Sequence, residues 1–307
     1  MLEVTELRKR YTPGAPEALA GVSFDVGEGE VFGLLGPNGA GKTTTIGVLT
    51  TRVSPTGGTA RVDGVDVTRD PVAVKQRIAV VPQRPNLDRA LTAMENLTFH
   101  AAYFGYRRAE RRHRALDMLE QFGLEGRGGD RVNSYSGGMA QRLMIARALM
   151  HQPRVLFLDE PTTGLDPQSR LFLWDRIEAL RRSGTTILLT THDMQEADRL
   201  CDRIAIVDHG QRIALDTPRG LRDLLPGAQG LELTLSADED PAAPFGELGD
   251  VESQVAAGGW LVRVYGEVSA AEAIAAAERA GAEIVDLHRI DGSLEDVFVH
   301  LTGRDLR

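Results

Sequence analysis

The sequence contains a single cysteine, Cys201, in 307 residues. One cysteine can form no intramolecular disulfide and no Cys-rich metal site, which is typical of a protein in a reducing compartment. Long apolar runs are also absent, because no window approaches the roughly 18 uninterrupted apolar residues of a membrane-spanning helix. The N-terminus lacks the basic and apolar regions of a signal peptide. We therefore expect a cytoplasmic chain that does not itself cross a membrane.

Dense basic runs are missing as well, and the formal net charge is -9. This balance disfavours DNA or RNA as the main ligand. Lysine is rare: only Lys9, Lys42 and Lys75 occur among the 35 basic residues. A hydrophobic content of 42% and a charged content of 26% are typical of a globular protein. The length predicts about two domains.

One of the three lysines lies in a glycine-rich loop that fits the pattern G-x-x-x-x-G-K-[ST]. The loop reads Gly36-Pro37-Asn38-Gly39-Ala40-Gly41-Lys42-Thr43-Thr44. In this pattern backbone N–H groups cradle phosphates, the lysine reaches the β- and γ-oxygens, and the hydroxyl after it ligates Mg²⁺. The buried run Val31–Leu35 before the loop and a helical pattern after it supply the expected context. The alternative is an ordinary glycine-rich turn, but a rare lysine in this place favours phosphate binding.

Residues 2–35 show short runs with β character between Gly- and Pro-rich turns, which predicts a β-rich layer before the loop. Tyr11 lies 25 residues before Gly36, far enough to cross this layer and return beside a nucleotide. Its ring is a candidate to stack on adenine. A strand tyrosine packed on its neighbours is an equal alternative.

The remainder of residues 1–220 predicts an α/β domain. From about residue 85 to 150 the pattern becomes mostly helical, which indicates a helical insertion. Apolar strands at 155–160 and 185–191, with a helix at 171–182 between them, form a crossover unit, and a last strand follows at 204–207. We expect a parallel sheet covered on both faces.

Asp159 and Glu160 end the first of these strands. An aspartate in this position can hold Mg²⁺, and the next carboxylate can take a proton from an attacking water. Two turn acids without a function are the alternative, but the apolar strand and the loop together favour a site.

A Pro- and Gly-containing stretch at 221–230 marks a boundary, and residues 221–307 predict a small C-terminal α+β domain. Its runs fit a split β-α-β-β-α-β unit followed by a closing helix.

A second anion-binding device follows the helical insertion: the turn Ser136-Gly137-Gly138 opens a helix at about Met139 to Met150. A single nucleotide needs only one such device. With the loop and the two carboxylates in this order, the chain resembles the ATP-binding subunits of ABC transporters over about residues 2–220. In that family the signature turn binds the γ-phosphate held by the opposite subunit.

The resemblance implies roles for individual residues. It places Tyr11 in the aromatic A-loop, Gly36 to Thr44 in the Walker A loop, Gln83 in the Q-loop as a contact of Mg²⁺ or its water, Ser136, Gly137 and Gly138 in the signature, Asp159 as the Walker B aspartate, Glu160 as the catalytic glutamate, Asp166 in the D-loop, and His192 as the switch histidine. Metal contacts then fall to Thr43, Gln83 and Asp159, and the cofactors are ATP and Mg²⁺.

Two residues depart from the family signature, since Tyr135 replaces the usual Leu and Met139 the usual Gln. These changes leave the Ser136 hydroxyl and the backbone N–H groups in place, so they bear on coupling rather than on phosphate contact. The signature together with the tail from Leu294 to Arg304 looks like the daunorubicin-resistance-type multidrug (ABC-2) exporters. An amphipathic helix packed on its own domain also explains this tail.

The resemblance further implies a homodimer with ATP between the subunits, and a separate permease seated near Gln83 and the helical insertion. The chain would then lie at the cytoplasmic face of the membrane and power export of a drug or other hydrophobic compound. A glycan or lipid exporter is the alternative cargo class. An ABC ATPase without a permease is disfavoured: the 53 residues between Gln83 and Ser136 are too few for the coiled coils of DNA-repair members, and ribosome-acting members carry two cassettes. A P-loop kinase would lack the signature turn.

Overall fold

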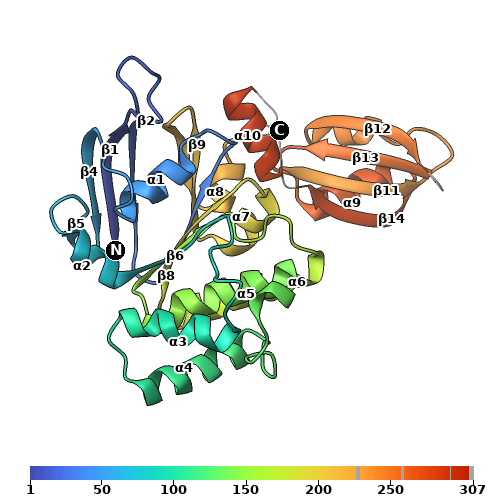
Figure 1. Ribbon diagram of the computed structural model, residues 1–307. Helices are drawn as coiled ribbons and strands as arrows, with labels where there is room; N and C mark the ends of the chain where they lie inside the picture. Colours follow the sequence, from blue (N-terminus) through green and yellow to red (C-terminus); the bar gives the residue numbers. More distant parts are fainter. Residues whose placement is uncertain (226–228, 257–258, 291, 304–307) are drawn as a thin grey trace. The chain divides into compact units, whose positions relative to one another are not determined.

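The computed structural model describes residues 1–225, 229–256, 259–290 and 292–303. It divides the chain into two compact units, Met1–Pro218 and a second unit that begins at Arg219 (Figure 1). Arg304, the last residue of the tail that looks like the multidrug exporters, lies outside the described residues, as do residues 226–228 of the predicted boundary.

A six-stranded sheet forms the centre of the first unit, in the strand order β10-β9-β3-β8-β7-β6. Its strands are β3 (Val31–Leu35), β6 (Ile78–Val81), β7 (Val155–Asp159), β8 (Thr186–Thr191), β9 (Arg203–Asp208) and β10 (Gln211–Asp216). All residues of β3, β7 and β8 are buried. This is the result of covering both faces of a parallel sheet, and it explains why these strands are apolar without alternation.

The expectation of a wholly parallel sheet is wrong at one edge. β10 pairs antiparallel with β9, whereas the other neighbours are parallel. Every residue of β10 is exposed or half-buried, so the strand carries no apolar run that a sequence pattern could reveal. The one signal in the sequence was the glycine at position 210. In the structure His209 and Gly210 form the turn between β9 and β10, and their positive φ values of 47° and 73° fit a tight hairpin.

A four-stranded antiparallel sheet, in the order β2-β1-β4-β5, confirms the predicted β-rich layer. Its strands are β1 (Leu2–Lys9), β2 (Leu19–Val26), β4 (Gly57–Val62) and β5 (Val65–Asp66). Helix α1 (Lys42–Leu49) contacts β4 of this sheet and β7 of the central sheet. A core of aliphatic and aromatic side chains, including the stacked rings of Phe24 and Phe32, joins the two sheets around α1.

The other helices of this unit are α2 (Pro71–Arg77), α3 (Ala93–Tyr103), α4 (Arg108–Gln121), α5 (Gly137–Ala148), α6 (Pro167–Arg182) and α7 (Met194–Leu200), with 3-10 turns η1 (Val132–Ser134) and η2 (Leu149–His151). Helices α3, α4 and α5 pack on one another and form the expected helical layer, and α5 also contacts β6. Figure 1 shows this layer away from β1, β2 and β4. Helix α7 packs on β3 and β8.

Two helices begin earlier than the sequence pattern predicts, and both do so because a polar side chain caps them. The Ser136 side chain accepts a hydrogen bond from the backbone N–H of Met139, so α5 begins at Gly137. The Asp166 side chain accepts one from Ser169, and Pro167 occupies the first turn of α6. A cap and a first-turn proline favour a helix start without any apolar periodicity.

The second unit contains an antiparallel sheet in the order β12-β13-β11-β14. The elements in chain order are α8 (Pro218–Arg222) at the boundary, β11 (Gly230–Ser236), η3 (Ala243–Glu247), β12 (Asp250–Ala256), β13 (Gly259–Tyr265), α9 (Ala270–Arg279), β14 (Glu283–Ile290) and α10 (Leu294–Thr302). The strand order matches the predicted split unit, but its first helix is only the 3-10 turn η3. Phe245 of η3 and the alanines of α9 fill the core against Leu233 and Val262.

Candidate nucleotide-binding site

The loop between β3 and α1 is packed so closely that two of its glycines have no room for a side chain. A Cβ on Gly36 would collide with the carbonyl oxygen of Val207. Gly41 has φ 106°, and a Cβ there would lie 2.7 Å from the carbonyl oxygen of Ala18. Glycine is the residue that accepts both this conformation and this contact. The loop borders a cavity of about 280 Å³ lined by Ala18, Pro37, Asn38, Gly39, Gly41, Lys42, Thr43, Thr44, Gln83 and Glu160.

Lys42 is the first residue of α1 and is buried. Its Nζ donates to the carbonyl oxygens of Gly36 at 2.5 Å and of Pro37 at 3.2 Å, and lies 3.6 Å from Oε1 of Glu160. Burial lowers the pKa of the Lys42 ammonium, and the carboxylates of Glu160 and Asp159 oppose that shift. The ammonium is therefore held at the mouth of the loop next to a carboxylate.

Asp159 ends β7 and lies opposite Thr190 of β8 in the parallel register. Oδ1 of Asp159 accepts a hydrogen bond from the Thr190 hydroxyl at 2.7 Å and lies 3.4 Å from the Thr43 hydroxyl. A carboxylate and a hydroxyl this close are the oxygen ligands that Mg²⁺ prefers. The donor set therefore fits the metal that the sequence analysis expects.

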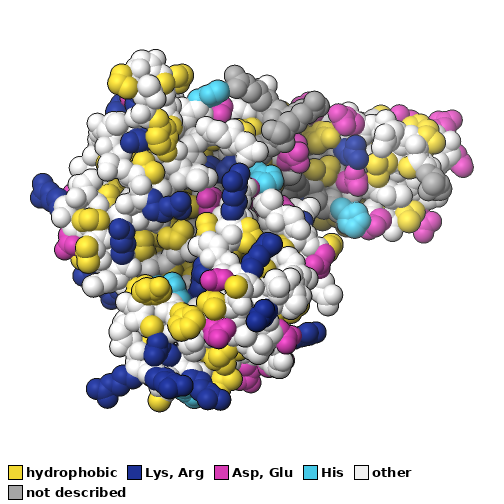
Figure 2. All heavy atoms as spheres, viewed as in Figure 1, with side chains coloured by type: hydrophobic (Ala, Val, Ile, Leu, Met, Phe, Trp, Pro, Cys, Tyr) yellow, Lys and Arg dark blue, Asp and Glu magenta, His cyan; other side chains and the backbone are white. Residues whose placement is uncertain are grey.

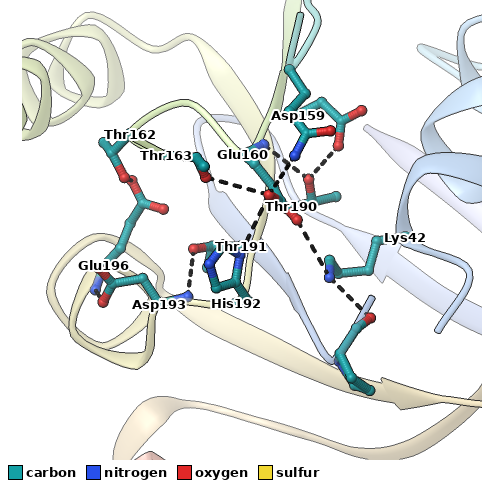
Figure 3. Close-up of polar contacts among 12 residues, drawn as sticks. Lys42, Asp159, Glu160, Thr162, Thr163, Thr190, Thr191, His192, Asp193 and Glu196 are labelled. Atoms are coloured by element: carbon teal, nitrogen blue, oxygen red, sulfur yellow. Dashed lines mark hydrogen bonds and ion pairs between the residues drawn. The ribbon is translucent and has the colours of Figure 1, made fainter. Parts of the chain in front are cut away.

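Glu160 is buried, although its φ of 48° is uncommon for any residue but glycine. Its backbone N–H donates to the Thr190 carbonyl at 3.0 Å. Its Oε2 accepts from Gln83 Nε2 at 2.8 Å and lies 3.4 Å from Nδ1 of His192 (Figure 3). Strained backbone that is fixed by its surroundings is concentrated at functional sites. The Q-loop, switch and catalytic candidates thus meet on one carboxylate.

Tyr11 lies beside the loop, with its hydroxyl 3.3 Å from the Thr44 hydroxyl. Nζ of Lys9 is 5.1 Å from the centre of the ring, and 62% of the residue is exposed. An exposed aromatic ring next to a phosphate loop can stack on a planar base.

The signature residues lie in a different group of contacts. A Cβ on Gly138 would fall 3.0 Å from the Cβ of Ser169, and the Ser169 hydroxyl donates to Asp166 at 2.7 Å. Ser136 and Gly137 are exposed at the start of α5, and Figure 1 shows α5 apart from α1. Within the part of the chain that the structure describes, no hydrogen bond or ion pair joins Ser136, Gly137, Gly138 or Asp166 to the loop residues 36–44.

The departure at Tyr135 has a structural counterpart. The Tyr135 hydroxyl donates to the carbonyl oxygen of Arg127 at 2.9 Å, and burial raises the pKa of this phenol. A leucine could not make this bond, so the segment before the signature has an added anchor.

Three polar residues of the site were missed by the sequence analysis: Thr163, Thr190 and Glu196. Thr163 lies 3.3 Å from Glu160 through its hydroxyl, and Thr190 binds Asp159. Glu196 is fully buried, and its Oε1 accepts from Thr162 at 2.8 Å. A signal existed only for Thr190, because neighbouring parallel strands bring their carboxyl ends together.

Comparison with known proteins agrees with this geometry. The family model described as "ABC transporter" matches residues 19–163. The "Nod factor export ATP-binding protein I" of Paraburkholderia xenovorans (strain LB400) is 41% identical, covering 100% of this chain and 98% of the relative. The "Daunorubicin resistance ATP-binding protein DrrA2" of Streptomyces coeruleorubidus is 42% identical, covering 97% of this chain and 93% of the relative.

Solved structures are similar over the first part of the chain. An "ATP binding subunit of ABC transporter" has a TM-score of 0.66 at 34% identity, covering 73% of this chain and 92% of its own. The cassette MJ0796, solved as a dimer in a post-hydrolysis state with ADP and Pi, has a TM-score of 0.65 at 30% identity, covering 71% of this chain and 98% of its own. No described helix is both long enough and apolar enough to span a membrane. With relatives matched at this identity over essentially its whole length, the chain belongs to the ATP-binding subunits of ABC transporters, the ATPases that power transport.

Proposed function

We propose that this ATPase drives export of a drug or other hydrophobic compound through a separate permease. Support comes from the daunorubicin-resistance relative, which matches at 42% identity. A glycan or lipid cargo is the second candidate, since relatives named for Nod factor export match at 40–41% identity over the whole chain. We take residues 1–220 as the ATP-binding domain and 221–307 as a small C-terminal domain.

The convergence of Gln83, Lys42 and His192 on the carboxylate of Glu160 carries the assignment of the catalytic site. Lys42 and the backbone N–H groups of residues 36–44 bind the β- and γ-phosphates, and Tyr11 stacks on adenine. Thr43 and Asp159 would hold Mg²⁺, with Gln83 next to it. The metal, when bound, neutralises charge on the phosphate oxygens.

Glu160 orients the attacking water and accepts its proton, since it is the carboxylate at the edge of the phosphate cavity. His192, whose Nδ1 lies 3.4 Å from Oε2 of that carboxylate, supports the transferring phosphoryl group. Both residues follow strand ends of one sheet, so the protein fixes their separation before substrate binds.

Among the residues that the structure describes, no hydrogen bond joins the signature turn to residues 36–44 of the same chain, and this supports a homodimer with two ATP molecules between the subunits. In a two-fold symmetric interface, the loop of each subunit meets Ser136, Gly137 and Gly138 of the other. Asp166, adjacent to Gly138, then lies at the same interface. The dimeric arrangement of the MJ0796 cassette is consistent with this assembly.

The permease partner docks, in our proposal, on the helical layer near Gln83, which places the chain at the cytoplasmic face of the membrane. A cavity of about 610 Å³ lies between α2 and the end of α3, lined by Val72, Lys75, Gln76, Tyr103, Phe104, Gly105, Tyr106 and His151. Tyr103 is 88% exposed and Phe99 51% exposed beside it. Figure 2 shows hydrophobic side chains on this part of the surface. Exposed aromatic groups around a hollow are typical of a protein interface.

The test uses the purified chain with Mg-ATP and the Glu160→Gln variant. We expect the variant to lose turnover, retain ATP and run as a dimer in size-exclusion chromatography. A variant that hydrolyses ATP normally and stays monomeric would exclude the assigned role of Glu160. For the permease, Phe99→Asp should abolish co-purification with a permease co-expressed with this chain, while ATP binding by the isolated subunit is unchanged.

A further inference from the structure

Glu196 is a carboxylic acid with no exposed surface, in the first turn of α7. Its Oε1 accepts hydrogen bonds from the Thr162 hydroxyl at 2.8 Å and from the indole N–H of Trp174 at 3.2 Å. Its Oε2 is buried and has no hydrogen-bond donor among the described residues, and the nearby Thr191 hydroxyl favours the ionised form. Burial dominates and raises the pKa of this carboxyl.

The partners of Glu196 belong to two catalytic segments and the helix between them. Thr162 lies two residues after Glu160, in the turn that begins with the strained φ of Glu160. Glu196 itself lies four residues after His192, on the helix that Asp193 caps through the backbone N–H groups of Gln195 and Glu196. Figure 3 shows Glu196 and Thr162 directed toward each other from these two segments. One side chain therefore joins the turn that carries Glu160 to the helix that follows His192.

Packing alone would not need an acid here. Taking a carboxylate out of water costs stability, and well-packed apolar side chains of similar volume often replace buried ionic groups without loss. A hydrogen bond, unlike apolar contact, fixes the direction and distance between its two groups. What the carboxylate adds over a leucine of similar size is thus the geometry of the Thr162 and Trp174 bonds.

We propose that Glu196 is a positioning residue for ATP hydrolysis, which holds Glu160 and His192 at the separation that the attacking water requires. The proposal rests on the roles given above to Glu160 and His192. Glu196 is fully buried and is not among the residues that line the phosphate cavity, so it acts through Thr162. A displacement of about 1 Å at a reacting group costs as much as about 10²-fold in rate. Losing this link should therefore reduce kcat far more than ATP binding.

The experiment measures kcat, KM, ATP affinity and the midpoint of thermal unfolding for Glu196→Leu, Thr162→Val and the double variant. Leucine and valine keep a similar side-chain volume. In Glu196→Leu alone the buried Thr162 hydroxyl loses its acceptor, and the double variant avoids this cost because it removes that hydroxyl as well. We expect kcat to fall about tenfold or more in each, with KM and ATP affinity within about threefold of the original chain. The two changes should not add, because they break the same link. Thr162→Ser, which restores a hydroxyl, should recover the original kcat.

Gln195→Ala is the matched control, since Gln195 is the exposed neighbour on the same helix. A folded double variant with kcat within about twofold of the original would overturn the proposal. So would a general defect, in which the unfolding midpoint and the ATP affinity fall together with kcat. If Glu196→Leu fails to fold, Thr162→Val and Thr162→Ser decide the question alone. Glu160→Gln in the same assay separates the two claims. Full activity of Glu160→Gln refutes the role of Glu160. If Glu160→Gln is inactive while the Glu196 variants stay active, only the positioning role is refuted.

Discussion

Nζ of Lys42 and Oε1 of Glu160 lie 3.6 Å apart, with 5% and 7% of their side chains exposed. The two groups come from segments far apart in the sequence, the phosphate loop and the end of β7. Each group is the buried counter-charge of the other. Gln83 also donates a hydrogen bond to Glu160, and the Thr163 hydroxyl lies 3.3 Å from the same carboxylate. The lysine that we propose to bind phosphate and the proposed base are therefore expected to be coupled in their contributions to stability.

Lys42→Ala should remove ATP hydrolysis and also destabilise the fold. Removing one partner of a buried pair costs about 3–5 kcal/mol, and because Gln83 and Thr163 still satisfy Glu160 we expect roughly 2–3 kcal/mol. Urea unfolding monitored by circular dichroism gives this value. The variant Lys42→Ala/Glu160→Gln, which removes both charges, should regain much of the lost stability without regaining activity. Equal stabilities of both variants would contradict the coupling, and Arg52→Ala, at an exposed position, serves as the control.

Much of this site follows from local pattern. The loop, the apolar run before Asp159 and the turn at Ser136 each carry their chemistry in a few consecutive residues, so the sequence predicted them and the family. What could not be predicted depends on contacts distant in the chain. Glu196 meets Thr162 only after α7 packs on the central sheet, and β10 pairs with the edge of β9 although none of its six residues is buried. No periodicity marks such positions. The proximity of Gly138 to Ser169 is likewise a product of tertiary packing between α5 and α6.

Mixing two inactive variants should restore activity if loop and signature come from different subunits. Lys42→Ala removes the phosphate cation, and Ser136→Arg blocks the signature while leaving the loop intact. A mixed dimer contains one complete site, formed by the loop of the Ser136→Arg subunit and the signature of the Lys42→Ala subunit. We expect up to about a quarter of the original rate per site, since half the dimers are mixed and each has one good site of two. Steady-state phosphate release measures it, and no recovery in a mixture whose subunits demonstrably exchange would contradict the shared site.

Gly138→Ala should slow hydrolysis although alanine favours a helix by about 1 kcal/mol over glycine. The added Cβ would fall 3.0 Å from the Cβ of Ser169 and closer still to its hydroxyl, which is bound to Asp166. Either α5 moves or the Asp166 contact breaks, and both lie at the proposed dimer interface. Adding Ser169→Gly removes the clash and should restore most of the rate, because the backbone N–H of residue 169 still donates to Asp166. An unaffected kcat in Gly138→Ala alone would show that this packing is not needed.

Acid should destabilise the helical layer through His100, and the effect has a definite sign. Burial, with help from the nearby Arg147 and His151 charges, lowers the pKa of His100 from 6.5 to about 4. The unfolded chain then binds more protons than the folded chain between these two values, so stability is complete above pH 6.5 and is lost as the pH falls toward 4.

The full shift corresponds to about 3.4 kcal/mol at 1.36 kcal/mol per unit, and the partial exposure of His100 reduces our expectation to about 1–2 kcal/mol. Nε2 of His100 is buried and has no hydrogen-bond partner in the described parts of the chain, and the ring centre lies 5.3 Å from that of Phe104. His100→Phe therefore preserves the aromatic contact, breaks no hydrogen bond at Nε2 and cannot take up a proton. At pH 7 the variant should match the original chain, and at pH 4.5 it should be more stable in denaturant titrations. His113→Gln, at a site where 79% of the side chain is exposed, should follow the original chain at both pH values. If His100→Phe and the original chain lose stability in parallel, the acid sensitivity belongs to other groups.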